Sequence, residues 1–388
     1  MKILVNATPL KGLVTGISRY LSNLCREMER LPDTEVFYFD GFRVCEKMPA
    51  GARPHEWIRK TDRIWKLPAP MVTALRVGFL FVYERNLKRV LKKRRFDVYH
   101  DAGFFPCDLK GLDVAQAFTL HDLSLIKLKR MHTRDRALFH DLFFKRRIFK
   151  ADQVITPSEY IRREFCEETG FLTSRVSAIA EACDPFFVET GGREKPGRLP
   201  PETSGEEWPE KYFLFAGTLE PRKNLSLALE ALEMAKNDAS LVIVGWEGWG
   251  DKSCLEKARR SLGRRIVVRG YLDDALLRAL YQNALALVYP SFYEGFGLPL
   301  LEAMSLGCPV ICSHTSALPE VAGDAAFFIH DLHDPRPLAG AMDRVAADDF
   351  FREKLRQKGR DRAKGFSWKK TAAQTREVFE KAMERSVS

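Results

Sequence analysis

Short hydrophobic runs alternate along the chain with longer segments in which apolar residues recur every three or four positions. Runs such as SLVIVG at 240–245 are typical of buried strands, and segments such as NLSLALEALEMAK at 224–236 are typical of helices packed on one side. Strands that alternate with helices predict βαβ units and parallel sheets, so we expect an α/β fold. The expected strands are 3–7, 35–39, 97–100, 115–122, 153–158 and 175–182 in the first half, and 212–219, 240–245, 265–272, 286–291, 309–313 and 325–329 in the second.

The strand and helix pattern stops once, at residues 191–211, which are rich in proline, glycine and charge and contain almost no apolar residues. A chain of 388 residues is longer than one hydrophobic core usually fills. We therefore predict a first domain at 1–190, a linker at 191–211, a second domain at 212–370, and a last helix at 371–388 that packs back on the first domain. Ligands of such sheets bind at the carboxyl ends of the strands and in the cleft between domains.

Composition narrows the cellular setting. The eight cysteines are scattered, with no C-x-x-C pair and no zinc-like spacing, which favours free thiols in a reducing compartment and no structural metal. The first residues, MKILVNATPL, have too few apolar positions for a signal peptide and resemble a first strand. The longest apolar run, 71–83, is interrupted by Arg76 and is shorter than the roughly 20 residues that a spanning helix needs. We expect a cytoplasmic location.

The positive charge is concentrated in the first half. The formal net charge is +10, and residues 1–190 contribute +9 of it. Much of the excess lies in 84–96 and 127–147, where apolar residues recur at helical spacing beside lysines and arginines. These patterns predict basic amphipathic helices, and three interpretations stay open: a solvated helix face, docking on the anionic inner face of the cytoplasmic membrane, or nucleic-acid binding.

Two carboxylates in the second half stand among small and apolar residues. Glu294 lies in the glycine-rich run EGFG after the strand expected at 286–291, and Glu302 follows eight residues later in a helix. A helix start preceded by glycines offers backbone N–H groups to an anion, and the carboxylates can accept hydrogen bonds from sugar or ribose hydroxyls. The alternative is that Glu302 complements the helix dipole and Glu294 is a solvated loop acid.

A second loop of the same layout carries two cations. In AGTLEPRKN, Arg222 and Lys223 follow the strand expected at 212–219 and precede a helix. An arginine can hold two phosphate oxygens at once and a lysine adds a compact charge, so the pair suits a diphosphate.

Taken together, these stretches resemble the family 4 retaining glycosyltransferases of GT-B type, particularly the mannosyltransferase-like branch that builds bacterial surface polysaccharides. Glu294 and Glu302, with seven residues between them, match the E-x7-E signature of that family. The resemblance covers essentially the whole chain and implies two Rossmann-like doubly wound domains that face each other across a cleft. The matching stretches are 155–165, 217–224, 293–304, 316–326 and 366–382.

The resemblance implies roles for individual residues of the second domain. Glu294 would bind hydroxyls of the donor sugar, and Glu302 would bind the nucleotide ribose. Arg222 and Lys223 would bind the diphosphate and stabilise the leaving group. The backbone amides of Gly295, Phe296 and Gly297 would complete the phosphate and sugar cradle, and Leu298 would also bind substrate.

Further positions follow from the same resemblance. His121, in TLHDLSL at a strand end, matches a first-domain histidine that faces donor sugar and acceptor, although a structural histidine is the alternative. Gly16 matches a glycine-rich loop near the donor phosphate. Thr218 stands where many relatives carry an arginine, and Tyr271 with Leu272 falls where the family holds the base.

The resemblance also implies a reaction. A nucleotide sugar, with GDP-mannose as the first candidate and UDP- or dTDP-hexoses as alternatives, would donate a hexose to a glycan or a polyprenyl-diphosphate-linked oligosaccharide. The anomeric configuration would be retained, and closure about the linker would exclude water. We expect no cofactor and no metal, since the chain has no D-x-D triplet.

Two other classes of function stay open. A GT-B nucleotide-sugar epimerase would share the architecture, whereas a dinucleotide oxidoreductase should show G-x-G-x-x-G after a strand with an acid about 20 residues later, which neither half provides. A nucleic-acid binder is suggested only by the basic first half and lacks a recognition motif. We therefore expect no nucleic-acid partner.

Overall fold

The computed structural model describes residues 1–12, 14–49, 51, 67–103, 105–188, 199, 208–246, 248–250 and 253–386. Most of the linker expected at 191–211 lies outside these residues. The chain forms two compact units, one made of Met1–Glu181 with Ser367–Ser388 and the other of Ala182–Phe366. Each unit is built on a parallel sheet, so the predicted α/β class is confirmed.

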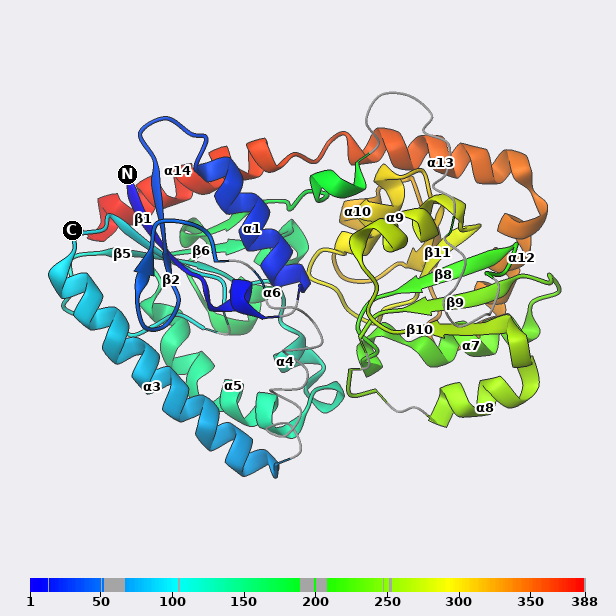
Figure 1. Cartoon of the computed structure of the whole chain (residues 1–388), viewed down its shortest axis with the longest axis horizontal. Helices are drawn as coiled ribbons and strands as arrows, with labels where there is room; N and C mark the ends of the chain where they lie inside the picture. The colour runs from blue at the N-terminus through cyan, green and yellow to red at the C-terminus, as the bar shows by residue number, and fades with distance from the viewer. Residues whose placement is uncertain are drawn as a thin grey trace. The chain divides into compact units, whose positions relative to one another are not determined.

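The sheet of the first unit has seven strands in the order β3-β2-β1-β4-β5-β6-β7 (Figure 1). All neighbouring strands are parallel except β3, which pairs antiparallel with β2. Every residue of β4 and β5 is buried, as expected for strands covered by helices on both faces. The strands are β1 (Lys2–Asn6), β2 (Glu35–Phe39), β3 (Val44–Cys45), β4 (Val98–Asp101), β5 (Ala115–Thr119), β6 (Gln153–Thr156) and β7 (Val176–Ala178).

Helices cover the first sheet, and the last helix of the chain is one of them. α14 (Trp368–Ser386) packs on α1 (Gly16–Met28) and contacts β5 and β6, and Figure 1 shows α14 in red beside α1 in blue. The other helices of the unit are α3 (Ala69–Lys93), α4 (Ser124–Lys127), α5 (Arg134–Arg147) and α6 (Glu159–Thr169), with the 3-10 turns η1 (Thr8–Lys11), η2 (Lys129–Met131), η3 (Ile148–Lys150) and η4 (Thr173–Arg175).

The second unit has a six-stranded sheet in the order β10-β9-β8-β11-β12-β13, and all of its neighbouring strands are parallel (Figure 1). Its strands are β8 (Tyr212–Ala216), β9 (Ser240–Val244), β10 (Ile266–Arg269), β11 (Ala286–Tyr289), β12 (Val310–Ser313) and β13 (Phe327–Ile329). Its helices are α7 (Leu225–Met234), α8 (Ser253–Leu262), α9 (Asp274–Asn283), α10 (Leu298–Ser305), α11 (Leu318–Ala322), α12 (Pro335–Ala347) and α13 (Asp349–Ala363), with η5 (Pro185–Phe187), η6 (Pro221–Lys223) and η7 (Gly263–Arg265).

Two hydrophobic clusters lie on the two faces of the second sheet. Leu214 and Val242 belong to one cluster, and their sequence neighbours Phe213 and Leu241 belong to the other. This alternation follows from the two-residue period of a strand, and burial on both faces explains why the runs are apolar throughout. The strands are thereby fixed in position, so the loops at their carboxyl ends are held on a rigid base.

The basic stretches of the first unit differ from their prediction. Residues 127–147 do not form one helix, because α4 ends at Lys127 and α5 begins at Arg134. In 84–96, the apolar side packs inward, since Leu87 is fully buried in a core cluster with Val90 against it. The apolar side of 84–96 is therefore covered by the core of this unit, whereas Leu138 and Leu142 on α5 are 43% and 48% exposed. None of the helices within the described residues is long and apolar enough to span a membrane.

Candidate functional site

The two cations predicted for a diphosphate lie at the carboxyl ends of β8 and β11, in direct contact with Glu294. Nη1 of Arg222 donates to Oε2 of Glu294 at 2.9 Å and to the carbonyl oxygen of Tyr293 at 2.9 Å. Nζ of Lys223 donates to Oε1 of Glu294 and to the hydroxyl of Tyr289, each at 2.6 Å. The structure therefore joins three of the four predicted catalytic residues in one cluster.

Sequence reasoning missed a further acid of this cluster. Oε1 of Glu220 lies 2.7 Å from Nε of Arg222, and the Glu220 side chain is only 6% exposed. Arg222 is thus held between two carboxylates. The run Glu-Pro-Arg-Lys could have indicated it, because it places an acid in the same short loop as the cations. Tyr289 was missed as well, since it reads as a core strand residue until its hydroxyl is seen against Lys223.

The electrostatics of the cluster keep Glu294 ionised. Burial alone would raise the pKa of Glu294, but the charges of Arg222 and Lys223 outweigh it and lower the pKa to about 2. Burial lowers the pKa of Lys223, and Glu294 opposes that shift. An ionised carboxylate can only accept hydrogen bonds, so Glu294 suits hydroxyl and cationic partners. The interpretation of Glu294 as a solvated loop acid is wrong, because the residue is 5% exposed.

The loop after Glu294 turns sharply into α10. Gly297 caps the helix with φ +105°, and a Cβ atom there would lie 2.7 Å from Cδ2 of Leu318, so only glycine fits. Leu298 is the first residue of the helix, where backbone N–H groups are without helical partners. The Phe296 side chain packs in the core against Phe366 at a ring distance of 5.8 Å. A ligand could therefore contact the backbone of Phe296 but not its side chain.

The hydroxyl of a half-buried serine, Ser316, fixes the start of the same loop. The backbone N–H of Glu294 donates to Oγ of Ser316 at 2.9 Å, and the N–H of Phe292 donates to the carbonyl oxygen of Arg222 at 2.8 Å. These bonds join the loop after β11 to the loops after β12 and β8. The cluster is consequently held by the backbone as well as by its charges.

Glu302 lies on the second turn of α10, since the helix begins at Leu298. The hydroxyl of Tyr281, on α9, donates to Oε2 of Glu302 at 3.1 Å, and Glu302 is 6% exposed. The helix dipole acts mainly within the first turn, so the alternative explanation of Glu302 as a dipole partner is weakened.

The remaining positions of the second unit lie on the loops after β8, β9 and β10. Gly245, after β9, has φ +141°, and a Cβ atom there would lie 1.9 Å from the carbonyl oxygen of Gly217. Thr218 directly follows Gly217 in the loop after β8 and is half-buried. Tyr271 is 37% exposed and Leu272 packs against the core. Both follow β10, which is separated from β8 by β9.

In the first unit, His121 follows β5 and pairs with an acid that was not predicted. Its Nδ1 lies 3.4 Å from Oε1 of Glu181, and its ring meets Tyr20 edge to face at 5.0 Å. Gly16 is the first residue of α1, is exposed, and follows the N-cap Thr15, whose hydroxyl accepts from the N–H of Ser18. His121 thus lies just after the carboxyl end of β5, as the sequence predicts, whereas Gly16 begins α1 and is separated from β1 by η1.

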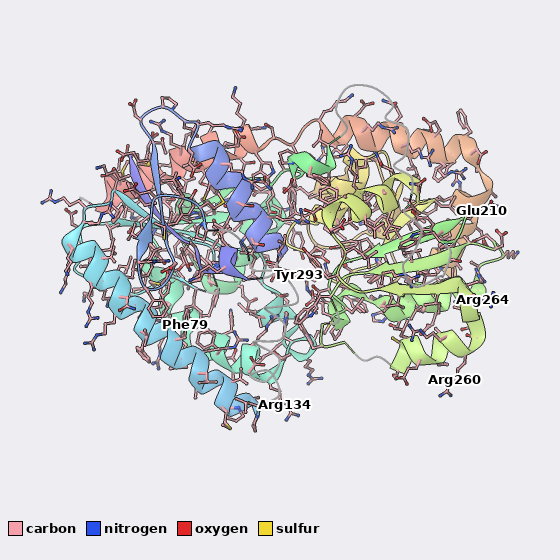
Figure 2. All side chains as sticks on the ribbon, in the orientation of Figure 1. Phe79, Arg134, Glu210, Arg260, Arg264 and Tyr293 are labelled. Atoms are coloured by element: carbon pink, nitrogen blue, oxygen red, sulfur yellow. The ribbon has the colours of Figure 1, made fainter. Side chains whose placement is uncertain are left out.

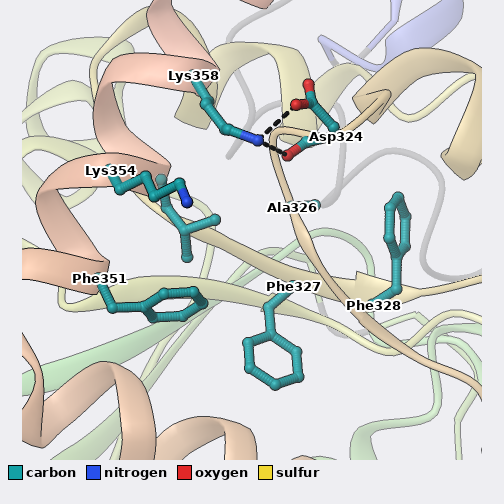
Figure 3. Close-up of a pocket in the computed structure, with 8 residues that line it drawn as sticks. Asp324, Ala326, Phe327, Phe328, Phe351, Lys354 and Lys358 are labelled. Atoms are coloured by element: carbon teal, nitrogen blue, oxygen red, sulfur yellow. Dashed lines mark hydrogen bonds and ion pairs between the residues drawn. The ribbon is translucent and has the colours of Figure 1, made fainter.

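A hollow of about 290 Å³ lies elsewhere on the second unit and is distinct from this cluster (Figure 3). Asp324 and Ala326 precede β13, so the hollow is at the amino end of that strand, whereas the cluster is at carboxyl ends. Lys358 pairs with Asp324 across it. Its lining residues are Asp324, Ala326, Phe327, Phe328, Phe351, Lys354, Leu355 and Lys358.

Among the described residues, no three His, Cys, Asp or Glu side chains are placed to hold a metal ion. We therefore assign no metal ligands. All eight cysteines are free thiols, and five of them are buried.

Comparison with known proteins identifies the class. Residues 14–185 match the family model Glycosyltransferase Family 4, and residues 201–362 match the model Glycosyl transferases group 1. Together the two models cover most of both units. The chain therefore belongs to the glycosyltransferases built from these two domains, as the sequence motifs predict.

One curated relative matches along nearly its whole length. The chain is 29% identical over 388 residues to the O-antigen chain mannosyltransferase B of Escherichia coli, covering 97% of this chain and 98% of that protein.

Solved structures show the same fold at lower identity. A sucrose-phosphate synthase from Thermosynechococcus elongatus superposes with a TM-score of 0.72 at 19% identity, over 97% of this chain and 98% of that one. WaaG, a glycosyltransferase involved in lipopolysaccharide biosynthesis, superposes with a TM-score of 0.69 at 16% identity, over 97% of this chain and 99% of that one. The chain has the GT-B fold.

Proposed function

We propose that this glycosyltransferase transfers a hexose, with mannose from GDP-mannose as the first candidate, to a glycan or lipid-linked glycan during synthesis of a bacterial surface polysaccharide. The observation that carries the proposal is the buried cluster of Glu294, Arg222 and Lys223 beside the amino end of α10. The relative named as an O-antigen chain mannosyltransferase supports the choice of sugar and pathway.

The cluster supplies what a nucleotide-sugar donor requires. Lys223 and Arg222 bring positive charge to a diphosphate. Backbone N–H groups at a glycine-rich helix start, as at 295–298, are donors of the kind that bind such an anion. Glu294, kept ionised by these cations, can accept hydrogen bonds from sugar hydroxyls. In the absence of donor, Glu294 neutralises the cations, so it also holds them in place until the diphosphate arrives.

The proposed reaction retains the anomeric configuration. The acceptor oxygen forms a bond to the anomeric carbon as the bond from that carbon to the diphosphate oxygen breaks. The departing phosphate oxygen takes the proton of the acceptor hydroxyl. Arg222 and Lys223 stabilise the negative charge that develops on the leaving group, which is the kind of term that often dominates catalysis. His121 would contact a sugar or acceptor hydroxyl.

Glu302 and the loop after β10 are the proposed nucleotide contacts. Glu302 would bind the ribose, with Tyr281 holding its other carboxylate oxygen. Tyr271 and Leu272 would flank the base, and UDP- or dTDP-hexoses are the alternative donors. We also propose that transfer needs no cofactor or metal ion, because the two cations of the cluster provide the charge at the diphosphate. Chelation with EDTA should leave the rate unchanged.

We further propose that the first unit docks on the anionic inner face of the cytoplasmic membrane, where a lipid-linked acceptor would be found. Four large apolar side chains of α3 recur at intervals of four, four and three residues, and each is about half exposed. They are Met71, Leu75, Phe79 and Val82, and Arg85, Arg89 and Lys93 continue the same helix side (Figure 2 labels Phe79 on α3). An exposed apolar stripe that runs into bases suits a bilayer surface.

The experiment that tests donor binding is a thermal-shift panel of nucleotides and nucleotide sugars. A ligand that binds only the folded state raises the melting temperature by an amount set by its concentration and affinity. GDP-mannose is expected to give the largest shift. Nucleic acid is included in the panel as well, and a shift given by nucleic acid alone would overturn the proposal.

A further inference from the structure

His121 packs against an aromatic side chain that is itself anchored. Its ring packs edge to face on Tyr20 at 5.0 Å, and Tyr20 also contacts Trp368 at 6.0 Å. The hydroxyl of Tyr20 is hydrogen bonded to Oγ1 of Thr119 at 3.0 Å, two residues before His121. Since Tyr20 is fully buried, it forms a fixed wall on one side of the imidazole.

Glu181 lies on another side of the ring. It is 4% exposed, and its Oε1 is 3.4 Å from Nδ1 of His121. A buried carboxylate is costly unless it has a charged or hydrogen-bonding partner. Within the described residues, His121 is the ion-pair partner that the structure gives Glu181. The backbone just before Glu181 is fixed too, because Thr371 on α14 donates to the carbonyl oxygen of Ala180 at 2.7 Å.

The opposite ring nitrogen has no such partner. Nε2 of His121 is buried and makes no hydrogen bond among the described residues. Buried polar atoms in folded proteins are nearly always paired, so an isolated one needs an explanation. A ligand hydroxyl is the simplest group that would satisfy an imidazole nitrogen at the carboxyl end of a sheet.

We propose that Glu181 is a positioning residue for His121. Its carboxylate accepts a hydrogen bond from Nδ1–H of the imidazole. This bond keeps the ring proton on Nδ1 and leaves Nε2 as the acceptor for a substrate hydroxyl. This inference rests on the proposed function for the identity of that hydroxyl, and on the structure alone for the Glu181–His121 pair. In metal sites, removing a carboxylate that orients a histidine through its second nitrogen lowers activity by about 10- to 100-fold. A comparable loss of activity is expected when Glu181 is replaced.

The direct test is the tautomer of His121, read by nitrogen NMR of protein labelled with 15N-histidine at a pH where the ring is neutral. His121→Asn identifies the signals of that ring by removing them. The wild-type ring is expected to carry its proton on Nδ1, and Glu181→Ala is expected to shift the proton toward Nε2. A wild-type ring with its proton on Nε2, or a tautomer that Glu181→Ala leaves unchanged, would overturn the proposal.

Kinetics provide the second readout. Glu181→Ala should lower kcat by about 10- to 100-fold with little change in KM for the donor. Glu181→Gln keeps the volume of the side chain and an acceptor oxygen, so it should fold and keep part of the rate. Glu167→Ala, which removes an exposed carboxylate of α6 in the same unit, is the matched control and should change neither kcat nor the NMR signals. Equal rates in wild type and Glu181→Ala would contradict the proposed role.

The two proposals can fail separately. If no donor is turned over by the wild-type protein, the proposed function fails, while the NMR experiment still decides whether Glu181 sets the tautomer. If transfer occurs but the tautomer does not depend on Glu181, the pairing fails and the proposed function stands.

Discussion

The ammonium group of Lys223 donates to Oε1 of Glu294 at 2.6 Å, and both side chains are more than nine-tenths buried. Removing one member of a buried pair leaves an uncompensated charge, which is far more costly than the pair is favourable. The contact therefore links the stability of the second unit to the residues proposed for donor binding.

Glu294→Gln is expected to abolish transfer and to lower the free energy of unfolding by about 3 kcal/mol, because Arg222 and Lys223 lose their shared carboxylate. Denaturant unfolding and nucleoside diphosphate release measure the two effects. Glu233→Gln, at an exposed position on α7, is the matched control and should change neither. A Glu294→Gln protein with wild-type activity would show that the cluster is structural only.

The same carboxylate predicts a pH dependence of stability. The pKa of Glu294 falls from the ordinary value of 4.5 to about 2 in the folded chain. A depressed pKa adds stability above the unfolded pKa, and that stability is lost as the pH falls from about 4.5 toward 2. The difference in unfolding free energy between wild type and Glu294→Gln should shrink below pH 4.5. A difference that is constant between pH 7 and pH 3 would argue against an ionised Glu294.

Lys223→Met should lower kcat by about 100- to 1,000-fold, the range found when a charge-stabilising donor is removed from an active site. Methionine retains most of the buried volume, so the loss would come from the missing charge. Lys211→Met removes an exposed lysine just before β8 and serves as the control. Nucleoside diphosphate release is the measurement, and an unchanged rate in Lys223→Met would remove this residue from the site.

Gly297→Ala should destabilise the second unit and reduce transfer. The backbone at φ +105° is strained for any side chain, and Cδ2 of Leu318 would lie 2.7 Å from the new Cβ. A loss of about 1–3 kcal/mol in unfolding free energy is expected. Gly340→Ala, inside α12 with nothing near its Cβ, should be neutral or slightly stabilising. Equal effects of the two substitutions would mean that the turn into α10 tolerates a side chain.

Membrane docking is tested on the exposed stripe of α3. Replacing Leu75 and Phe79 with serine should weaken co-sedimentation with vesicles that contain anionic lipid, because two half-exposed apolar side chains are lost. Phe350→Ser removes a side chain of the second unit that is 84% exposed, and it should have no effect. If vesicle binding is unchanged after Leu75 and Phe79 are replaced, the exposed stripe of α3 is a solvated helix face and not the docking surface.

The alternation of strands and helices made most strands of both sheets predictable, because strands buried on both faces read as apolar runs. Their order within each sheet does not follow the chain, since β1 and β8 each have later strands on both sides. Glu294, Arg222 and Lys223 were found because glycines and a helix start mark the loops that carry them. Glu181, Glu220 and Tyr289 were missed, since a partner distant in sequence decides what each of them does.

The basic helices show the same limit. Periodicity indicates that a helix has an apolar side, but it does not tell whether protein covers that side. Leu87 is fully buried, whereas Phe79, eight residues earlier on the same helix, is 51% exposed. The apolar residues of 84–96 pack in or against the core, whereas Leu138 and Leu142 in 127–147 are about half exposed, as are several apolar residues of 71–83.

The most direct test of the proposed function is product formation from GDP-mannose and a polyprenyl-diphosphate-linked glycan, followed by mass spectrometry of the glycan and by GDP release. The wild-type protein is expected to add one hexose to the acceptor and to release one GDP for each hexose added. Glu294→Gln is expected to do neither, and Lys223→Met to do both about 100- to 1,000-fold more slowly. Failure to turn over any hexose nucleotide, or full turnover by both variants, would contradict the proposal.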